Sequence, residues 1–242
     1  MKHRADQMLV ARGLFESRAR AQAAIAAGLV SADGAPVRRA SDMLDGAARI
    51  EAQAPHPYVS RGGLKLAAAL DTFGFDPAGL ACLDVGASTG GFTDLLLRRG
   101  AAHVTAVDVG RDQLHASLRQ HPRVTSLEGQ DIRTLPAAAL PAAPGLACID
   151  VSFISLRLVL PAVAGLLSPD GCLAALVKPQ FEAGRAALKK GVVRDEAVHR
   201  HICEDMAGVL AELGFDVQGP IVSPIEGGDG NREFLLGGRR LG

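Results

Sequence analysis

The sequence is poor in aromatic residues: its 242 residues contain no tryptophan and one tyrosine, and aromatic residues make up 4% of the total. Stacking of bases on aromatic rings therefore cannot be the main way in which this chain holds a nucleic acid. It also has no excess of charge, because 26 basic and 26 acidic side chains cancel to a formal net charge of zero. No strong global field draws the protein onto a polyanion, so any contact with nucleic acid must be local.

Long apolar runs are absent as well. The longest stretch without a charged residue is 134–149, and three prolines interrupt it, so no segment reaches the roughly 18 apolar residues of a membrane-spanning helix. The basic residues at the start are followed by Asp6 and Gln7 rather than by the apolar run of a secretory signal, and we expect a cytoplasmic location. The four cysteines form no Cys-x-x-Cys pair and the seven histidines form no cluster, which predicts reduced core cysteines and no metal site.

The front of the chain has its own pattern. Residues 1–60 carry eight basic and six acidic side chains, a net of 8 − 6 = +2. Two short segments with helical spacing, the second capped by Ser17, precede a strand, an Asp33-Gly34 turn and further short strands. We expect a small α+β domain over 1–53 and a linker over 54–60, where two prolines favour extended chain.

In the remainder of the chain, strand and helix patterns alternate. Apolar runs of strand length, typical of strands buried on both faces, occupy 81–85, 103–107, 124–127, 146–151 and 172–177, and helical patterns occupy 62–73, 91–99, 112–119 and 155–167. Ser60 is placed to cap the first of these helices. This alternation predicts an α/β fold with a doubly wound parallel sheet. A helix over 195–213 and two strands, 215–222 and 233–237, then predict an antiparallel pair at the sheet edge, because their connection is too short for a crossover helix.

A glycine-rich turn follows the first of these strands. Its spacing, Gly86-x-x-x-Gly90-Gly91, differs from the Gly-x-Gly-x-x-Gly of dinucleotide sites and from the Walker A motif. Asp108 follows the second strand and can accept hydrogen bonds from ribose hydroxyls, while Asp131 follows the third and can accept from an adenine amino group. Together these acids indicate an adenosine ligand without a pyrophosphate. The alternative, a turn that only closes a strand–helix joint, leaves the two acids unexplained.

The run Asp84-Val85-Gly86-Ala87-Ser88-Thr89-Gly90-Gly91-Phe92-Thr93 resembles motif I of the FtsJ-like methyltransferases. Residues 14–30 are similar to the S-four-type RNA-binding domain, and both domains in this order, with Ser60-Arg61-Gly62-Gly63-Leu64-Lys65-Leu66 between them, resemble the TlyA family. That family is named for haemolysis but contains ribosomal RNA 2′-O-methyltransferases. The resemblance implies an S-four-type domain over 1–53 and a Rossmann-like S-adenosylmethionine-dependent methyltransferase domain over 61–242. The cofactor would be held by Asp84, Gly86, Ala87, Ser88, Thr89, Gly90, Gly91, Phe92, Asp108 and Asp131.

Two charged residues end apolar strands, where an unpaired charge is costly: Asp150 lies at the end of the fourth strand and Lys178 at the end of the fifth. A ribose 2′-hydroxyl is a weak acid and needs a base, or a cation that stabilises the alkoxide, and lysine can supply either. The FtsJ-like family uses a Lys-Asp-Lys-Glu tetrad, and the resemblance places it on Lys65, Asp150, Lys178 and Glu233. It implies that Lys178 acts on the hydroxyl, that Asp150 and Glu233 fix its position, and that Lys65 repels it electrostatically and contacts the target nucleotide. The alternative interpretation is that both Lys65 and Glu233 are surface charges without a catalytic role, Lys65 as an exposed helix lysine and Glu233 as an edge-strand charge.

The predicted activity is 2′-O-methylation of ribosomal RNA, with cytidines of 16S and/or 23S rRNA implied by the family and with ribosomal RNA or subunits as partners. Phe153 either stacks on the target base or belongs to the core, and the basic loop with Arg185, Lys189, Lys190 and Arg194 either contacts phosphates or is simply solvated. Phosphate contacts in the front domain are expected from Arg4, Arg12, Arg18, Arg20, Arg38 and Arg39.

Three rival functions differ in the features they need. In a nucleobase amino-methyltransferase, the segment Asp150-Val151-Ser152-Phe153 would be the motif that binds the amine, although both prolines of that motif are missing. A non-catalytic RNA-binding protein of ribosome assembly predicts a broken cofactor motif or tetrad, whereas both are complete here. A membrane-active haemolysin, which the family name suggests, lacks a supporting span or basic amphipathic helix.

Overall fold

A computed structural model describes residues 2–184, 188–227 and 230–240 of the chain. The chain divides into two compact units, Met1–Pro57 and Tyr58–Gly242, and the division falls inside the segment 54–60 that was expected to be a linker. Each unit has its own hydrophobic core, so each is described by itself.

The smaller unit packs two helices against short strands. Its elements are β1 (Lys2–Arg4), α1 (Ala5–Ala11), α2 (Arg18–Ala26), β2 (Val30–Ala32), β3 (Ala35–Pro36), β4 (Met43–Asp45) and β5 (Ile50–Ala52). The strands form a β1-β4 pair and a β3-β2-β5 sheet, and β1 and β4 were not expected from the sequence. Ser17 caps α2 by accepting from the Arg20 amide, as the sequence predicts, and Asp33 and Gly34 turn the chain with positive φ angles. The core includes Leu9, Phe15, Ile25 and Val30.

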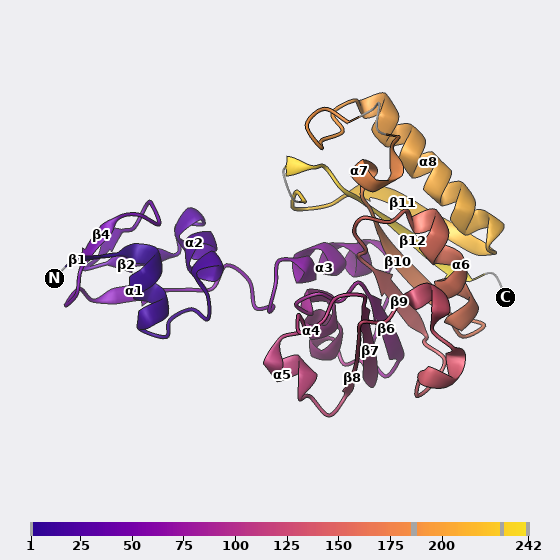
Figure 1. The fold of residues 1–242 in the computed structure, drawn as a ribbon, viewed down its shortest axis with the longest axis horizontal. Coiled ribbons are helices and arrows are strands. Elements are labelled where there is room, and N and C mark those ends of the chain that lie inside the picture. Colours follow the sequence, from indigo (N-terminus) through magenta and orange to yellow (C-terminus); the bar gives the residue numbers. More distant parts are fainter. Residues whose placement is uncertain (1, 185–187, 228–229, 241–242) are drawn as a thin grey trace. The chain divides into compact units, whose positions relative to one another are not determined.

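The larger unit is built on a seven-stranded sheet of order β11-β12-β10-β9-β6-β7-β8 (Figure 1). Its strands are β6 (Ala81–Val85), β7 (His103–Asp108), β8 (Val124–Glu128), β9 (Leu146–Ile149), β10 (Cys172–Val177), β11 (Phe215–Val222) and β12 (Phe234–Arg240). The pairs formed among β6 to β10 are all parallel, whereas β12 pairs antiparallel with both β10 and β11. The predicted doubly wound sheet with an antiparallel pair toward one edge is therefore confirmed.

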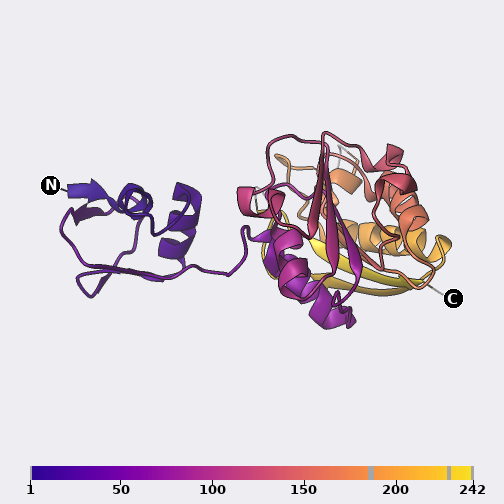
Figure 2. The same cartoon turned by 90° about the horizontal axis from the view of Figure 1, so that it is seen from below.

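Helices cover both faces of this sheet, as Figure 2 shows from below. They are α3 (Gly62–Phe73), α4 (Gly91–Arg98), α5 (Ala116–Arg119), α6 (Leu156–Leu166), α7 (Pro179–Glu182) and α8 (Glu196–Glu212), with 3₁₀ turns η1 (Ile132–Thr134) and η2 (Ala137–Ala139). One core cluster joins the sheet to α3 and α4, and the other joins it to α6 and α8. The four cysteines are all buried, as expected.

Three local predictions for this unit are wrong. Helix α3 begins after Arg61 without a side-chain cap, so Ser60 is not its N-cap. The helix expected over 112–119 is reduced to α5, because Asp112 has a φ of +56°, outside the right-handed helical region; the Glu128 carboxylate accepts from the amides of residues 112–114. Strand β8 is only half buried, since it forms an edge of the sheet rather than an interior strand.

Within the described ranges, no helix has the length and apolar character needed to cross a membrane.

Candidate active site

The glycine-rich turn joins β6 to α4 and is built over a buried carboxylate. Gly86 and Gly90 have φ angles of +82° and +98°, and a Cβ atom on Gly86 would overlap the Asp150 carbonyl. Asp84 has 0% exposure, and its Oδ2 accepts from the Thr93 amide at 2.9 Å and from the Thr93 hydroxyl at 2.6 Å. Burial raises the pKa of Asp84 to about 7. Asp84 thus lies beneath the turn and lines neither cavity described below, although the sequence placed it among the cofactor ligands.

A cavity of about 630 Å³ opens at the carboxyl ends of β6, β7 and β9. Both strand-end acids predicted to hold adenosine, Asp108 and Asp131, line it. The Asp108 carboxylate accepts from the Ser88 and Gly110 amides at 2.8 and 2.7 Å and so ties the glycine turn to the end of β7. Asp131 is engaged by Arg133, whose guanidinium lies 2.6 Å from it; these hydrogen bonds lower the pKa of Asp131. Arg133 was not expected here from the sequence.

Lys178 follows β10 and is 9% exposed, immediately before Pro179 begins α7. Its Nζ lies 2.6 Å from Asp150 Oδ1 in an ion pair and donates to the Ser152 hydroxyl at 2.8 Å. Asp150 reaches Lys178 because β9 and β10 are parallel neighbours whose carboxyl ends meet at one edge. Ser152, two residues after Asp150, is a contact that sequence reasoning missed. This arrangement fixes the Lys178 amine beside Asp150 and Ser152, which both line the cavity, whereas Lys178 itself is not among the lining residues.

Lys65 and Glu233 form the second ion pair of the predicted tetrad. Lys65 Nζ donates to Glu233 Oε2 at 2.6 Å, and their side chains are 11% and 2% exposed, so the alternative that both are surface charges is wrong. In the described part of the chain, Glu233 contacts Lys65 and not Lys178, which differs from the expected role of Glu233 in fixing Lys178. Lys65 lines a second cavity, of about 270 Å³, that shares Gly86, Ser88 and Asp150 with the first.

The cofactor residues predicted along the glycine-rich turn divide between the cavities and the core. Gly86 and Ser88 line both cavities. The second cavity is also lined by Ala87, Thr89, Gly91 and Phe92. Gly90 lines neither: an added Cβ there would press on Leu118, so this glycine permits close packing of α5.

Phe153 projects from the loop after β9. It is 91% exposed, has a φ of +64° and lines the first cavity, so it does not belong to the core. Its ring centroid lies 5.0 Å from that of Phe181 in α7, and Glu182 of the same helix accepts from the Ser155 hydroxyl and the Leu156 amide. These contacts join the loop after β9 to the helix after Lys178. They hold an aromatic face at the mouth of the cavity despite an unfavourable backbone conformation.

The arginines predicted to bind RNA all lie in the smaller unit and differ in their contacts. Arg4 and Arg18 both contact Asp6. Arg12 donates to the backbone carbonyls of Gly46 and Ala48, so part of its role is to hold its own unit together. Arg20 lies 3.9 Å from Glu16. Arg38 and Arg39 are exposed, and their backbone amides donate to Asp42.

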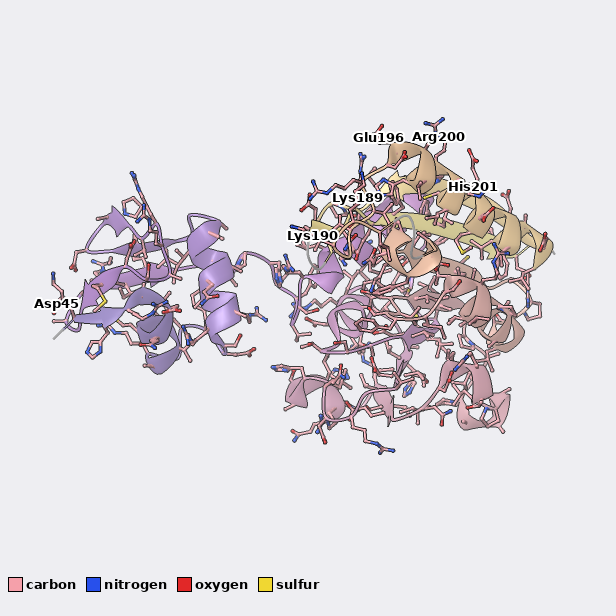
Figure 3. All side chains as sticks on the ribbon, turned by 45° about the horizontal axis from the view of Figure 1, so that its top comes forward. Asp45, Lys189, Lys190, Glu196, Arg200 and His201 are labelled. Carbon is pink, nitrogen blue, oxygen red and sulfur yellow. The ribbon has the colours of Figure 1, made fainter. Side chains whose placement is uncertain are left out.

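The described lysines of the basic loop after α7 lie on the surface of the larger unit. Lys189 and Lys190 are exposed, and Figure 3 shows both side chains directed outward beside α8. Gly191 accepts from Asn231 at 3.2 Å, which ties this loop to the segment before Glu233; Arg194 is exposed and Arg185 lies outside the described residues. Among the residues with described positions, no three histidine, cysteine or acidic side chains gather as metal ligands would.

Comparison with known proteins identifies related sequences and folds. The family model for FtsJ-like methyltransferases matches residues 58–240. The chain is 45% identical over 236 residues to the 16S/23S rRNA (cytidine-2′-O)-methyltransferase TlyA of Mycobacterium tuberculosis, which covers 96% of this chain and 88% of that protein. It is 37% identical to Hemolysin A of Brachyspira hyodysenteriae, covering 96% and 98%. A solved structure from Streptococcus thermophilus, provisionally named a hemolysin, superposes with a TM-score of 0.78 at 42% identity, covering 99% of this chain and 88% of that one.

Proposed function

Because this chain belongs to the TlyA group of the FtsJ-like methyltransferase family, we propose that it transfers a methyl group from S-adenosylmethionine to a ribose 2′-hydroxyl of ribosomal RNA. The cytidines of 16S and 23S rRNA named for the M. tuberculosis relative are the proposed targets, in RNA or in ribosomal subunits. The smaller unit is the proposed S-four-type RNA-binding domain. The observation that carries the proposal is the Lys178–Asp150 ion pair at the rim of a cavity suited to adenosine.

The first cavity fits the nucleoside part of the cofactor. Asp108 presents carboxylate oxygens that already accept two amides and retain lone pairs for ribose hydroxyls. Gly86 leaves the backbone open where a side chain would press on Asp150. When bound, S-adenosylmethionine supplies an electrophilic methyl group on a positively charged sulfur. The carboxylate of Asp108 on the cavity wall favours a cationic ligand there.

Lys178 is the residue proposed to act on the ribose hydroxyl. Its amine either accepts the hydroxyl proton or, as an ammonium, stabilises the alkoxide, and both roles need the nitrogen held beside the oxygen. Asp150 and Ser152 provide that fixed position through contacts of 2.6 and 2.8 Å. Lys65, held by Glu233, supplies a second cation at the adjoining cavity, where it is placed to contact the target nucleotide. Phe153 offers an exposed ring for the target base.

Two features favour ribose over nucleobase chemistry. The segment Asp150-Val151-Ser152-Phe153 lacks the prolines of the amine-binding motif. In addition, the Ser152 hydroxyl already accepts a hydrogen bond from Lys178. An amino group on a base also needs no strand-end lysine, whereas a 2′-hydroxyl does.

The test uses methyl-labelled S-adenosylmethionine and unmodified bacterial ribosomal subunits, followed by alkaline digestion of the RNA. Alkali does not cleave next to a 2′-O-methylated ribose, so the expected label is in alkali-resistant dinucleotides. Lys178→Met should lower the rate at least about 100-fold, the lower end of a general acid–base contribution. The matched control is Arg239→Met, which removes an exposed cation of β12. Arg239 lies opposite Cys172 in the strand register, at the end of β10 that is far from Lys178.

Label in mononucleotides would overturn ribose methylation, and a fall of less than tenfold for folded Lys178→Met would overturn the role of this lysine. Equal losses in Lys178→Met and Arg239→Met would show that the effect is not specific to the cavity rim. Circular dichroism of both variants establishes that the fold is retained.

A further inference from the structure

One buried carboxylate organises two arginines in the smaller unit. Asp6 lies in the first turn of α1 and has 0% exposure. Its oxygens accept from Arg4 Nε and Nη2 at 3.1 and 3.3 Å, from Arg18 Nε and Nη2 at 3.2 and 2.8 Å, and from Gln22 Nε2 at 2.9 Å. Arg4 ends β1, while Arg18 and Gln22 lie in α2, so three elements converge on this group.

The two guanidinium groups keep most of their donors free of Asp6. Each has five N–H groups, of which Asp6 engages one on Nε and one on Nη2. Three remain on each group, including both on Nη1, the second edge of the planar fork. The Arg4 and Arg18 side chains are 41% and 53% exposed although their shared acceptor is fully buried. The free N–H donors are therefore exposed to solvent on two side chains that Asp6 holds in position.

Charge and geometry define what such a pair can bind. Two arginines and one carboxylate leave a net charge of +1, and the carboxylate between them offsets the repulsion that would otherwise drive the guanidinium groups apart. The hydrogen bonds from Arg4 and Arg18 hold the pKa of Asp6 well below its usual range, so it stays an anion at neutral pH. The free edge of each guanidinium group can donate two hydrogen bonds to two oxygens of a phosphate. Because Asp6 already holds both arginine side chains in place, binding costs less side-chain conformational entropy.

We propose that Arg4 and Arg18, held on Asp6 and Gln22, form a preformed clamp for a backbone phosphate of RNA, with Asp6 as a positioning residue. The proposal rests on the proposed function, in which this unit binds RNA, and adds that binding depends on an acidic residue that never touches the ligand.

The test exploits a difference in sign. If the arginines act only as point charges, Asp6→Asn removes a negative charge and tightens RNA binding. If Asp6 positions them, Asp6→Asn weakens binding although the protein becomes more basic. The probe is a labelled, unmodified 23S rRNA transcript, bound to the full chain in filter assays over about 50–200 mM salt.

The expected result is a loss of at least about fivefold in affinity for Asp6→Asn. The double variant Arg4→Lys with Arg18→Lys keeps both charges but loses the forks. It should lose at least about tenfold with an unchanged salt dependence, because the same number of counterions is released. The matched control is Arg49→Lys, an arginine of the same unit that is 83% exposed and paired with Glu51 at 3.1 Å; its affinity should stay at the wild-type value.

Equal or tighter binding by folded Asp6→Asn, or wild-type affinity in the double lysine variant, overturns the clamp. If Asp6→Asn does not fold, the double lysine variant decides, because lysine can still pair with Asp6. The RNA affinity of each variant relative to the wild type tests the clamp, whereas the alkali-resistant label tests the proposed function. A wild-type protein that binds RNA without methylating it therefore refutes only the latter.

Discussion

The buried carboxylate of Asp84 makes the stability of the larger unit depend on pH in a defined direction. Asp84 Oδ2 is paired with Thr93, whereas Oδ1 has no hydrogen-bond partner within the described residues. Burial raises its pKa from 3.8 to about 7. Between these values the folded protein binds this proton more tightly than the unfolded chain does. The contribution is therefore complete below the unfolded pKa and is lost as the pH rises through the folded one.

The expected size follows from the two pKa values. The free energy of unfolding should fall by about 1.4 kcal/mol per pH unit inside the window. Between pH 5 and pH 8, about two units lie below the folded pKa, so the loss is about 3 kcal/mol. Asp84→Asn does not titrate, and its free energy of unfolding should lack this component. The variant should thus gain about 3 kcal/mol relative to the wild type on going from pH 5 to pH 8.

The measurement is urea unfolding of both proteins at several pH values. Tyr58 is the only tyrosine, the chain has no tryptophan, and Tyr58 belongs to the larger unit, so tyrosine fluorescence reports on that unit. Titrating groups common to both proteins cancel in the difference between them. Parallel pH profiles, with a difference constant to within about 0.5 kcal/mol, would refute the reasoning from burial.

Two further predictions concern the turn and the second ion pair. Gly86→Ala should weaken binding of S-adenosylhomocysteine by at least about tenfold in calorimetry, because its Cβ would press on Asp150. Gly79→Ala, with a φ of +73° but open space around the added atom, should bind normally, and equal losses in both would mean that φ strain alone is responsible. Glu233→Gln should lower the free energy of unfolding by about 3 kcal/mol by leaving Lys65 buried and unpaired. Adding Lys65→Met should restore most of that loss, and additive losses would contradict the pairing.

The sheet and one of the two ion pairs are predictable because they follow from local patterns and a topology rule. Apolar runs specify β6, β7, β9 and β10, and parallel neighbours bring their carboxyl ends together. That rule by itself places Asp150 beside Lys178. Strand burial is less predictable: β8 has the same kind of sequence but lies at the edge.

The features that escaped prediction depend on partners distant in the sequence. Glu233 pairs with Lys65, 168 residues away, only because β12 inserts next to β10. The non-helical segment 112–114, with a positive φ at Asp112, has its amides bound by the Glu128 carboxylate, a contact that no local propensity reveals. Asp84 belongs to a recognisable motif, yet its side chain points to Thr93 beneath the turn rather than to a ligand. Strand alternation allows either direction, and packing decides between them.

The position of β12 sets an order of assembly during protein synthesis. This strand leaves the ribosome after every other strand described here, yet it lies inside the sheet between β10 and β11. Until it is made, β10 has an unpaired apolar edge and Lys65 has no carboxylate partner. The larger unit is therefore completed after translation of Glu233. A chain terminated before that residue would expose an aggregation-prone strand edge rather than fold into a smaller enzyme.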